Sequence, residues 1–266
     1  MTAHRHDVAR FIAFADALAD AARAAILPHF RAGVACDDKG VDAFDPVTDA
    51  DRAGEAAMRT LIAREFPDHG VFGEEFERTP SRSGYEWVLD PIDGTRAFIA
   101  GLPTWGVLIA LAYEGRPIAG VMDQPYLDER YRGWGDGAEV SVRGERRPLR
   151  ARSCAALGDA IVSSTSPDLF AGDEAAAFAR VRAAARLTRY GYDCYAYAMV
   201  AAGHIDCVIE SGLKPFDIQA LIPIIEGAGG GVCDWRGGDA AQGGRVLAYS
   251  DARVRDAALT LLQGAR

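Results

Sequence analysis

The stretch WVLDPIDGTRAF, residues 87–98, places two aspartates three positions apart around a proline, directly after an apolar run. Pro91 fixes its own φ angle and favours an extended conformation at Asp90, so the Asp90 carboxylate is expected to point off the end of a strand. Gly94 permits a tight bend, and a helix is expected to begin at Thr95. Two carboxylates this close together repel each other unless a cation lies between them. We therefore predict a strand-to-helix turn that binds Mg²⁺, with a simple capped turn as the alternative.

The composition is that of a folded, acidic protein. The chain has 266 residues, of which 49% are hydrophobic and 25% are charged, so it is long enough for one large domain or two lobes. The formal net charge is −9, and no run of basic residues appears that would favour nucleic acid as the main partner. An acidic enzyme that acts on an anionic substrate needs local cations, and metal ions supply them.

Cysteine usage and the N-terminal sequence favour a cytoplasmic location. The number of cysteines is odd and none forms a C-x-x-C pair, so we expect neither a disulfide framework nor a structural zinc site. Charged residues interrupt every apolar stretch of residues 1–23, so we expect no signal peptide, no membrane span and no membrane partner. The cysteines are Cys36, Cys154, Cys194, Cys207 and Cys233.

Apolar periodicity predicts two helices followed by a sheet in the first half of the chain. Apolar residues recur at helical spacing in 8–27 and 49–66, and the second helix has Asp49 as its candidate N-cap. Residues 86–143 contain short apolar or alternating runs separated by glycine, proline and aspartate, as a meandering sheet requires. The basic stretch 143–152 either joins two lobes or forms a solvated surface.

Strands and helices alternate in the second half of the chain. We predict strands for the runs DAIVSS, IDCVIE, GGVCDW and RVLAYS. We predict helices for 173–186, for CYAYAMVAAG, for 217–228 and for 251–263. Together the two halves indicate an α/β or layered α+β architecture.

Three other acidic stretches accompany the aspartate turn. Glu74 begins a Glu-Glu pair after an apolar strand, although such a pair is most often exposed. Asp217 begins a strongly apolar helix, where an N-cap is the simplest explanation, and Glu210 precedes it at the end of a strand. Asp51 lies in DPVTDADRAGE, where it either caps the following helix or joins the same site.

Taken together, GEE at 73–75, DPIDGT at 90–95 and PFDIQA at 215–220 resemble the two signature regions of the inositol monophosphatase family. The members of this family are magnesium-dependent phosphatases related to fructose-1,6-bisphosphatase. The order and spacing of the motifs match over about residues 8–263.

The resemblance implies a fold and an assembly. The expected fold is a layered αβαβα sandwich with the metal site between two sub-lobes of a single domain, residues 1–266. An α+β sub-lobe of about 1–145 would carry the metal site, and an α/β sub-lobe of about 146–266 would complete it. The resemblance also implies two or three Mg²⁺ ions and a homodimer.

The resemblance further implies a role for individual residues. The family's metal ligands fall on Glu74, Asp90, the carbonyl of Ile92, Asp93 and Asp217. The groups that orient the attacking water fall on Glu74, Thr95 and Asp51. The phosphate would lie against Asp93, Gly94 and Thr95. The leaving-group side would be lined by Asp193 and Glu210.

Two stretches resemble the histidinol-phosphatase branch of the family, namely RAFIAGLPTWG after the first signature and YGYDCYAYA at 190–198. Inositol-directed members usually carry small residues where this chain has Gly191–Cys194. Phe216 departs from the family pattern, which commonly has Trp or Tyr before its aspartate, but it keeps an aromatic side chain. Asp193 is either a carboxylate for a cationic leaving group or the N-cap of the next helix.

The sequence thus predicts a magnesium-dependent phosphate monoester hydrolase, and specifically a histidinol-phosphate phosphatase of histidine biosynthesis. No Ser-His or Cys-His nucleophile is apparent and no histidines have the spacing of zinc ligands, so water is expected to attack phosphorus directly. Two alternatives stay open. One is an inositol-1-phosphate or broader sugar- or nucleotide-phosphate phosphatase, and the other is an accessory binding protein on the same scaffold.

Overall fold

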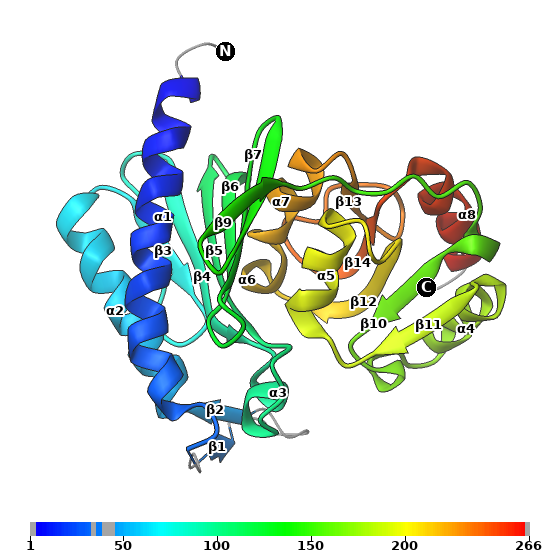
Figure 1. Ribbon diagram of the computed structural model, residues 1–266, viewed down its shortest axis with the longest axis horizontal. Helices are drawn as coiled ribbons and strands as arrows, with labels where there is room; N and C mark the ends of the chain where they lie inside the picture. The colour runs from blue at the N-terminus through cyan, green and yellow to red at the C-terminus, as the bar shows by residue number, and fades with distance from the viewer. Residues whose placement is uncertain (1–3, 33–35, 39–45, 264–266) are drawn as a thin grey trace.

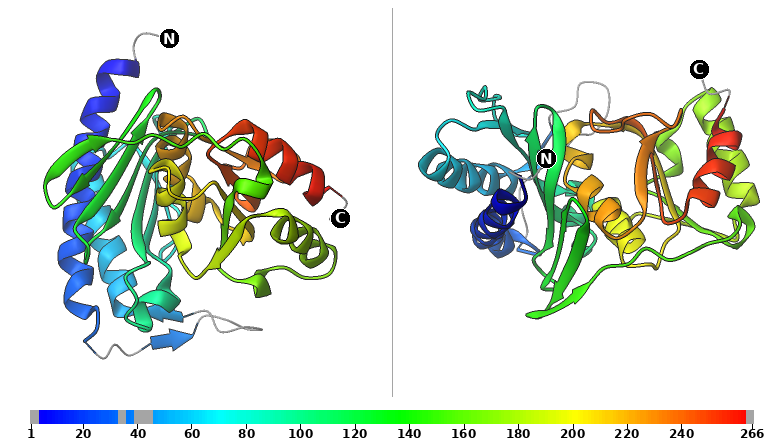
Figure 2. Two further views of the ribbon diagram at one scale, coloured as in Figure 1. Left: turned by 45° about the vertical axis from the view of Figure 1, so that its right-hand side comes forward. Right: turned by 90° about the horizontal axis from the view of Figure 1, so that it is seen from above.

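The computed structural model describes residues 4–32, 36–38 and 46–263, which form layers in the order helix, sheet, helix, sheet, helix (Figure 1). Seen from above in Figure 2, the middle helices lie between the two sheets, and further helices cover the outer face of each sheet. The predicted αβαβα sandwich is therefore confirmed. No helix in the described part of the chain is long and apolar enough to cross a membrane.

The first outer layer consists of the long helices α1 (His4–Ile26) and α2 (Asp49–Glu65). Both were expected from apolar periodicity, and their apolar sides form one core with the first sheet, around Trp87 and Ile109. A short hairpin, β1 (Cys36–Asp38) with β2 (Pro46–Thr48), lies just before α2 and was not predicted.

The prediction of Asp49 as the N-cap of α2 is wrong, because Thr48 holds that position. The Thr48 hydroxyl accepts a hydrogen bond from the backbone of Ala50 at 3.2 Å. Asp51 completes the capping box by accepting from the backbone of Thr48 at 2.8 Å. The exposed Asp49 carboxylate instead pairs with Arg52 on the surface of the helix.

The first sheet is a seven-stranded meander in the order β3-β4-β5-β6-β7-β8-β9, with only its β3–β4 pair parallel. The predicted meander is confirmed, and its last strand extends into the basic stretch as far as Pro148. The strands are β3 (Gly70–Gly73), β4 (Tyr85–Asp93), β5 (Gly106–Tyr113), β6 (Arg116–Gln124), β7 (Glu129–Trp134), β8 (Gly137–Val142) and β9 (Glu145–Pro148). The short helix α3 (Thr95–Ile99) begins at Thr95, as predicted.

The middle layer contains α5 (Asp193–Ala201), α6 (Pro215–Ile218) and α7 (Leu221–Gly227). The prediction of one continuous helix over 217–228 is wrong, because the chain turns between α6 and α7. Pro223 explains the interruption: it has no N–H to donate to the carbonyl of Gln219, and its ring would clash with that carbonyl in a continuous helix.

The second sheet has five strands in the order β11-β10-β12-β14-β13, with β10 parallel to both β11 and β12. Outer helices α4 (Asp173–Ala184) and α8 (Ala252–Leu262) cover it, close to their predicted ranges. The strands are β10 (Ile161–Ser164), β11 (Leu187–Tyr190), β12 (Cys207–Leu213), β13 (Gly231–Asp234) and β14 (Gly244–Tyr249). Of these, β11 was not predicted.

The connection between the two sheets is held by an ion pair between the half-buried Arg152 and the buried Asp206. Arg152 Nε donates to Asp206 Oδ1 at 2.7 Å, and the backbone of Ile161 donates to Asp206 Oδ2 at 2.7 Å. Burial acts to raise the pKa of Asp206, but the hydrogen bonds from Arg152 and Ile161 outweigh it and lower that pKa below its usual value. The ionised carboxylate therefore stabilises the native state.

We expect Asp206→Asn to lower the free energy of unfolding by about 2 kcal/mol at pH 7, because Arg152 loses its charged partner. A carboxylate whose pKa is lowered in the native state stabilises above its unfolded pKa of about 4, and that stabilisation is lost as the pH falls toward the native pKa. Urea unfolding of both proteins at pH 7 and at pH 3 should therefore give a difference that shrinks in acid. The exposed Asp159→Asn is the control, and equal stability of Asp206→Asn and wild type at pH 7 would contradict the prediction.

Candidate active site

Asp90 and Asp93 lie on the same face of the first sheet because β4 contains a β-bulge. Asp90 pairs with Leu108 of β5 and Asp93 pairs with Gly106, so β4 advances one residue more than β5 between these pairs. In a regular strand, residues three apart would point to opposite faces. The extra residue reverses the alternation and turns both carboxylates toward α5 and α6. Pro91 is compatible with the bulge because a bulged residue need not donate to the ladder.

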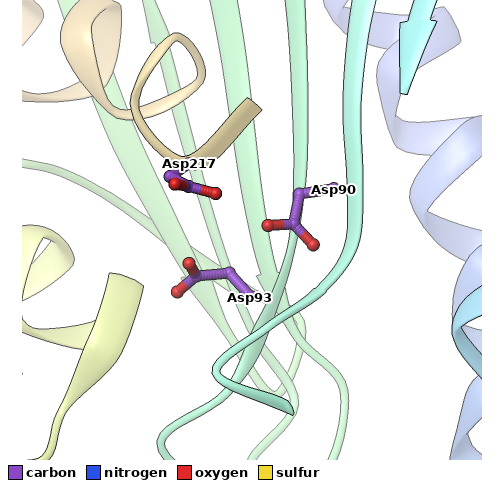
Figure 3. Close-up of side chains that lie close together, drawn as sticks. All are labelled: Asp90, Asp93 and Asp217. Carbon is purple, nitrogen blue, oxygen red and sulfur yellow. The ribbon is translucent and has the colours of Figure 1, made fainter. Parts of the chain in front are cut away.

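A third carboxylate reaches the same place from α6. Figure 3 shows Asp217 facing Asp90 and Asp93, and one oxygen from each lies within 4.8 Å of those of the other two. Asp217 is not the N-cap of α6, which is Lys214, but the third residue of the helix. Its Oδ2 still caps the helix by accepting from the backbone of Lys214 at 2.7 Å.

The donor chemistry of this cluster fits a divalent cation. Burial raises the pKa of Asp90 well above its usual value, and the charges of Glu74, Asp93 and Asp217 raise it further. Burial likewise raises the pKa of Asp93, with Asp193 and Asp217 adding to the effect. A cation among these oxygens would relieve the repulsion, and carboxylate oxygens are ligands that Mg²⁺ prefers.

Glu74 and Ile92 lie beside the aspartates. Glu74 directly follows β3, its backbone donates to the carbonyl of Leu89 at 3.2 Å, and its charge acts on Asp90. The backbone of Ile92 donates to Asp90 Oδ1 at 3.0 Å, which fixes the orientation of that carboxylate. The residues predicted as metal ligands therefore come from the end of β3, from β4 and from α6.

Thr95 and Asp51 form a hydrogen-bonding unit next to this cluster. Thr95 Oγ1 lies 3.0 Å from the carbonyl oxygen of Ile92 and 3.5 Å from Asp51 Oδ1, so its single proton has two acceptors. Asp51 Oδ2 accepts from both the backbone and the hydroxyl of Thr48. Burial raises the pKa of Asp51, while the hydrogen bonds from Thr48 oppose that increase. Asp51 thus both caps α2 and faces the site.

Gly94 lets β4 and α5 approach each other. Gly94 has a φ angle of +86°, and a Cβ added there would lie 3.0 Å from three side-chain atoms of Asp193. The interpretation of Asp193 as an N-cap is wrong, because α5 begins at Asp193 itself. The N-cap is Tyr192, and the side chain of Tyr192 makes no capping hydrogen bond. Asp193 has a φ angle of +45°, a conformation that few residues other than glycine adopt.

Asp193 and Glu210 join Asp93 and Asp217 around a cavity of about 190 Å³. Burial raises the pKa of Asp193 to about 6. Burial also raises the pKa of Glu210 to about 7, although Thr165 donates to it from both its backbone, at 2.8 Å, and its hydroxyl, at 2.6 Å. The cavity is thus lined by two members of the aspartate cluster and by two further carboxylates.

Polar residues of this cavity that sequence reasoning missed include Thr165, Tyr197 and Ser211. Thr165 directly follows β10, and no sequence signal links it to Glu210 on the neighbouring strand. Tyr197 had a signal, because it follows Asp193 by four residues and side chains at this spacing share one face of a helix.

Comparison with known proteins relates the chain to a family of phosphatases. The model of the inositol monophosphatase family matches residues 7–263. The "Bifunctional phosphatase IMPL2, chloroplastic" of Arabidopsis thaliana is 47% identical over 86% of this chain, although the match covers only 65% of that protein's length. A histidinol-phosphatase of Chlorobaculum parvum is 40% identical over 72% of this chain and 73% of its own length.

A solved structure agrees with these relatives. The chain superimposes on an inositol monophosphatase of Zymomonas mobilis with a TM-score of 0.85 and 41% identity, over 99% of this chain and 100% of the other. The layered fold and the carboxylate cluster are those of a metal-dependent phosphatase. The chain belongs to the inositol monophosphatase family, and it is a phosphoric monoester hydrolase with histidinol phosphatases among its relatives.

Proposed function

We propose that the chain is a magnesium-dependent histidinol-phosphate phosphatase, which converts L-histidinol phosphate and water to L-histidinol and phosphate. The observation that carries the proposal is that Asp193 and Glu210 line the same cavity as Asp93 and Asp217. L-Histidinol phosphate has an ammonium and an imidazole on its leaving group, and buried carboxylates are suitable partners for both. The name of the Chlorobaculum parvum relative supports this substrate.

The metal would be held by the residues that the sequence predicted as ligands, Glu74, Asp90, the carbonyl of Ile92, Asp93 and Asp217. When bound, Mg²⁺ would supply positive charge that offsets the repulsion between a phosphate dianion and its nucleophile, and would acidify water. Gly94 leaves room for the phosphate next to the backbone, because a side chain there would project into the cavity wall at Asp193.

The chain's own groups would position the attacking water and accept its proton. Thr95 Oγ1 can accept a hydrogen bond from water while it donates to Asp51 Oδ1. Asp51 has a pKa raised by burial, which suits a carboxylate that must take up a proton during the reaction. Glu74 would orient the same water. No nucleophilic side chain is needed for this sequence of events.

A direct comparison of substrates tests the proposal. We expect kcat/KM in magnesium buffer to be about 10- to 100-fold higher for L-histidinol phosphate than for inositol 1-phosphate. This factor corresponds to the free energy that one hydrogen bond to a charged group contributes. The second candidate is an inositol-1-phosphate phosphatase, which the similarity to the Zymomonas mobilis protein favours. A clear preference for inositol 1-phosphate would select this second candidate and overturn the first.

Four expectations that accompany this function stay predictions. They are the use of two or three Mg²⁺ ions, the role in histidine biosynthesis, the cytoplasmic location and the homodimer.

A further inference from the structure

Tyr197 places a polar group without a partner at the wall of the cavity. Its side chain is 2% exposed, and within the described residues its hydroxyl makes no hydrogen bond. Burial raises the pKa of Tyr197 well above its usual value, with the charges of Glu210, Asp93 and Asp217 adding to the effect. The group is therefore a protonated phenol close to three carboxylates.

An unpartnered buried hydroxyl costs free energy that phenylalanine, of nearly the same shape, would avoid. Tyr195 on the same helix shows the usual arrangement, because its hydroxyl donates to Glu129 at 2.8 Å. A ligand in the cavity that completes the hydrogen bonding of the Tyr197 hydroxyl would offset this cost.

Glu210 has an available oxygen in the same cavity. Both hydrogen bonds from Thr165 end on Glu210 Oε1, and Oε2 accepts none from the described part of the chain. A phenol oxygen can accept from one N–H of a ligand while a carboxylate oxygen accepts from another N–H of the same group. Tyr197 and Glu210 Oε2 together therefore suit a ligand group that carries several N–H donors and a positive charge.

We infer that Tyr197 is a specificity-determining residue that, together with Glu210, binds the protonated amine of the leaving group. This inference deepens the proposed function and rests on it for the identity of the leaving group. One ammonium N–H would donate to the phenol oxygen and another to Glu210 Oε2. Inositol has hydroxyl groups but no ammonium, so it would not make the charged contact.

The test compares Tyr197→Phe with Tyr195→Phe, the matched control, which makes the same change outside the cavity. The substrates are L-histidinol phosphate and the analogue that lacks its amine, 3-(imidazol-4-yl)propyl phosphate. We expect Tyr197→Phe to raise KM for L-histidinol phosphate about tenfold with kcat within about twofold. Its kinetics on the analogue should equal those of wild type, and Tyr195→Phe should change neither substrate.

Calorimetry gives a readout apart from activity. Binding of L-histidinol to the magnesium-loaded protein should weaken about tenfold in Tyr197→Phe, whereas binding of Mg²⁺ alone should be unchanged. Equal losses on both substrates, or weaker Mg²⁺ binding, would mean that Tyr197 acts through Asp93 or Asp217, and would overturn the inference.

The two proposals can fail separately. If wild type prefers L-histidinol phosphate over inositol 1-phosphate but Tyr197→Phe changes the kinetics on L-histidinol phosphate and on the analogue by the same factor, the inference fails and the proposed function stands. If wild type prefers inositol 1-phosphate but Tyr197→Phe still selectively weakens L-histidinol binding, the proposed function fails and the inference stands. If the kinetics of wild type on L-histidinol phosphate and on the analogue without the amine are equal, the inference fails, whichever substrate the enzyme prefers.

Discussion

Asp93→Asn is expected to lower kcat/KM by about 1,000-fold or more while leaving the fold intact. Asp93 lies where the aspartate cluster meets the cavity, so the substitution removes negative charge that the bound cation needs. The fold should survive because Asp93 Oδ2 accepts from the backbone of Cys194 at 2.6 Å, and an asparagine oxygen can accept the same bond. Turnover of L-histidinol phosphate and circular dichroism measure the two effects.

Thermal unfolding with and without Mg²⁺ separates loss of the metal from loss of structure. Without metal, the variant should be at least as stable as wild type, because a repelling buried carboxylate is gone. At a Mg²⁺ concentration of about 100 times Kd, wild type should gain about 2.7 kcal/mol and the variant much less. Asp49→Asn makes the same change on an exposed residue and should behave as wild type. Full activity of Asp93→Asn would remove Asp93 from the site.

Much of the fold could be predicted because its signals are local. The helical spacing of apolar residues in α1 and α2 depends only on the sequence within each helix, and both helices form within a few residues of the expected bounds. The meander from β4 to β7 shows short apolar runs separated by turn residues, which is also a local pattern.

The features that were missed depend on partners far away in the sequence. The bulge in β4 is defined by its register against β5, and nothing within residues 90–93 alone shows that both carboxylates face α6. The hydrogen bonds from Thr165 to Glu210 join residues that are 45 positions apart. The strand β11 contains two polar residues among its four and is a strand because it pairs with β10.

Site residues could be named from the sequence, whereas their local structural roles could not. Asp193 and Asp217 were both assigned to the cavity by resemblance, and both line it. The local explanation offered for each was an N-cap, which neither is. Asp193 has a positive φ angle where it packs closely against Gly94, and this conformation has no signature in the flanking residues.

Two glycines determine how the helix pair α6–α7 rests on the first sheet. Gly120 of β6 pairs with Gly133 of β7, and together they form a shallow surface under α7. A Cβ at Gly120 would lie 2.0 Å from the carbonyl oxygen of Ala220, and a Cβ at Gly133 would lie 2.2 Å from Cα of Ile224. These contacts are with backbone, which cannot rotate away as a side chain can. The helix pair must therefore move if either glycine gains a side chain.

Gly120→Ala is accordingly expected to lower the free energy of unfolding by about 3–5 kcal/mol. This loss is at or above the largest values usual when atoms are added to a well-packed core. The backbone of Gly120 needs no positive φ angle, so the loss would come from the contact with Ala220 alone. Urea unfolding measures it, and Gly158→Ala, whose Cβ would meet nothing closer than 3.9 Å, should stay within about 0.5 kcal/mol of wild type.

The same substitution tests whether the packing of α7 positions the metal site. Only two residues separate α6 from α7, so a displacement of α7 should also displace Asp217 from Asp90 and Asp93. At a temperature where Gly120→Ala is still folded, its affinity for Mg²⁺ should therefore be lower than that of wild type. A variant that is destabilised but binds Mg²⁺ normally would show that α6 keeps its place when α7 moves. The position of Asp217 would then depend on its own capping bond to Lys214 rather than on the sheet beneath α7.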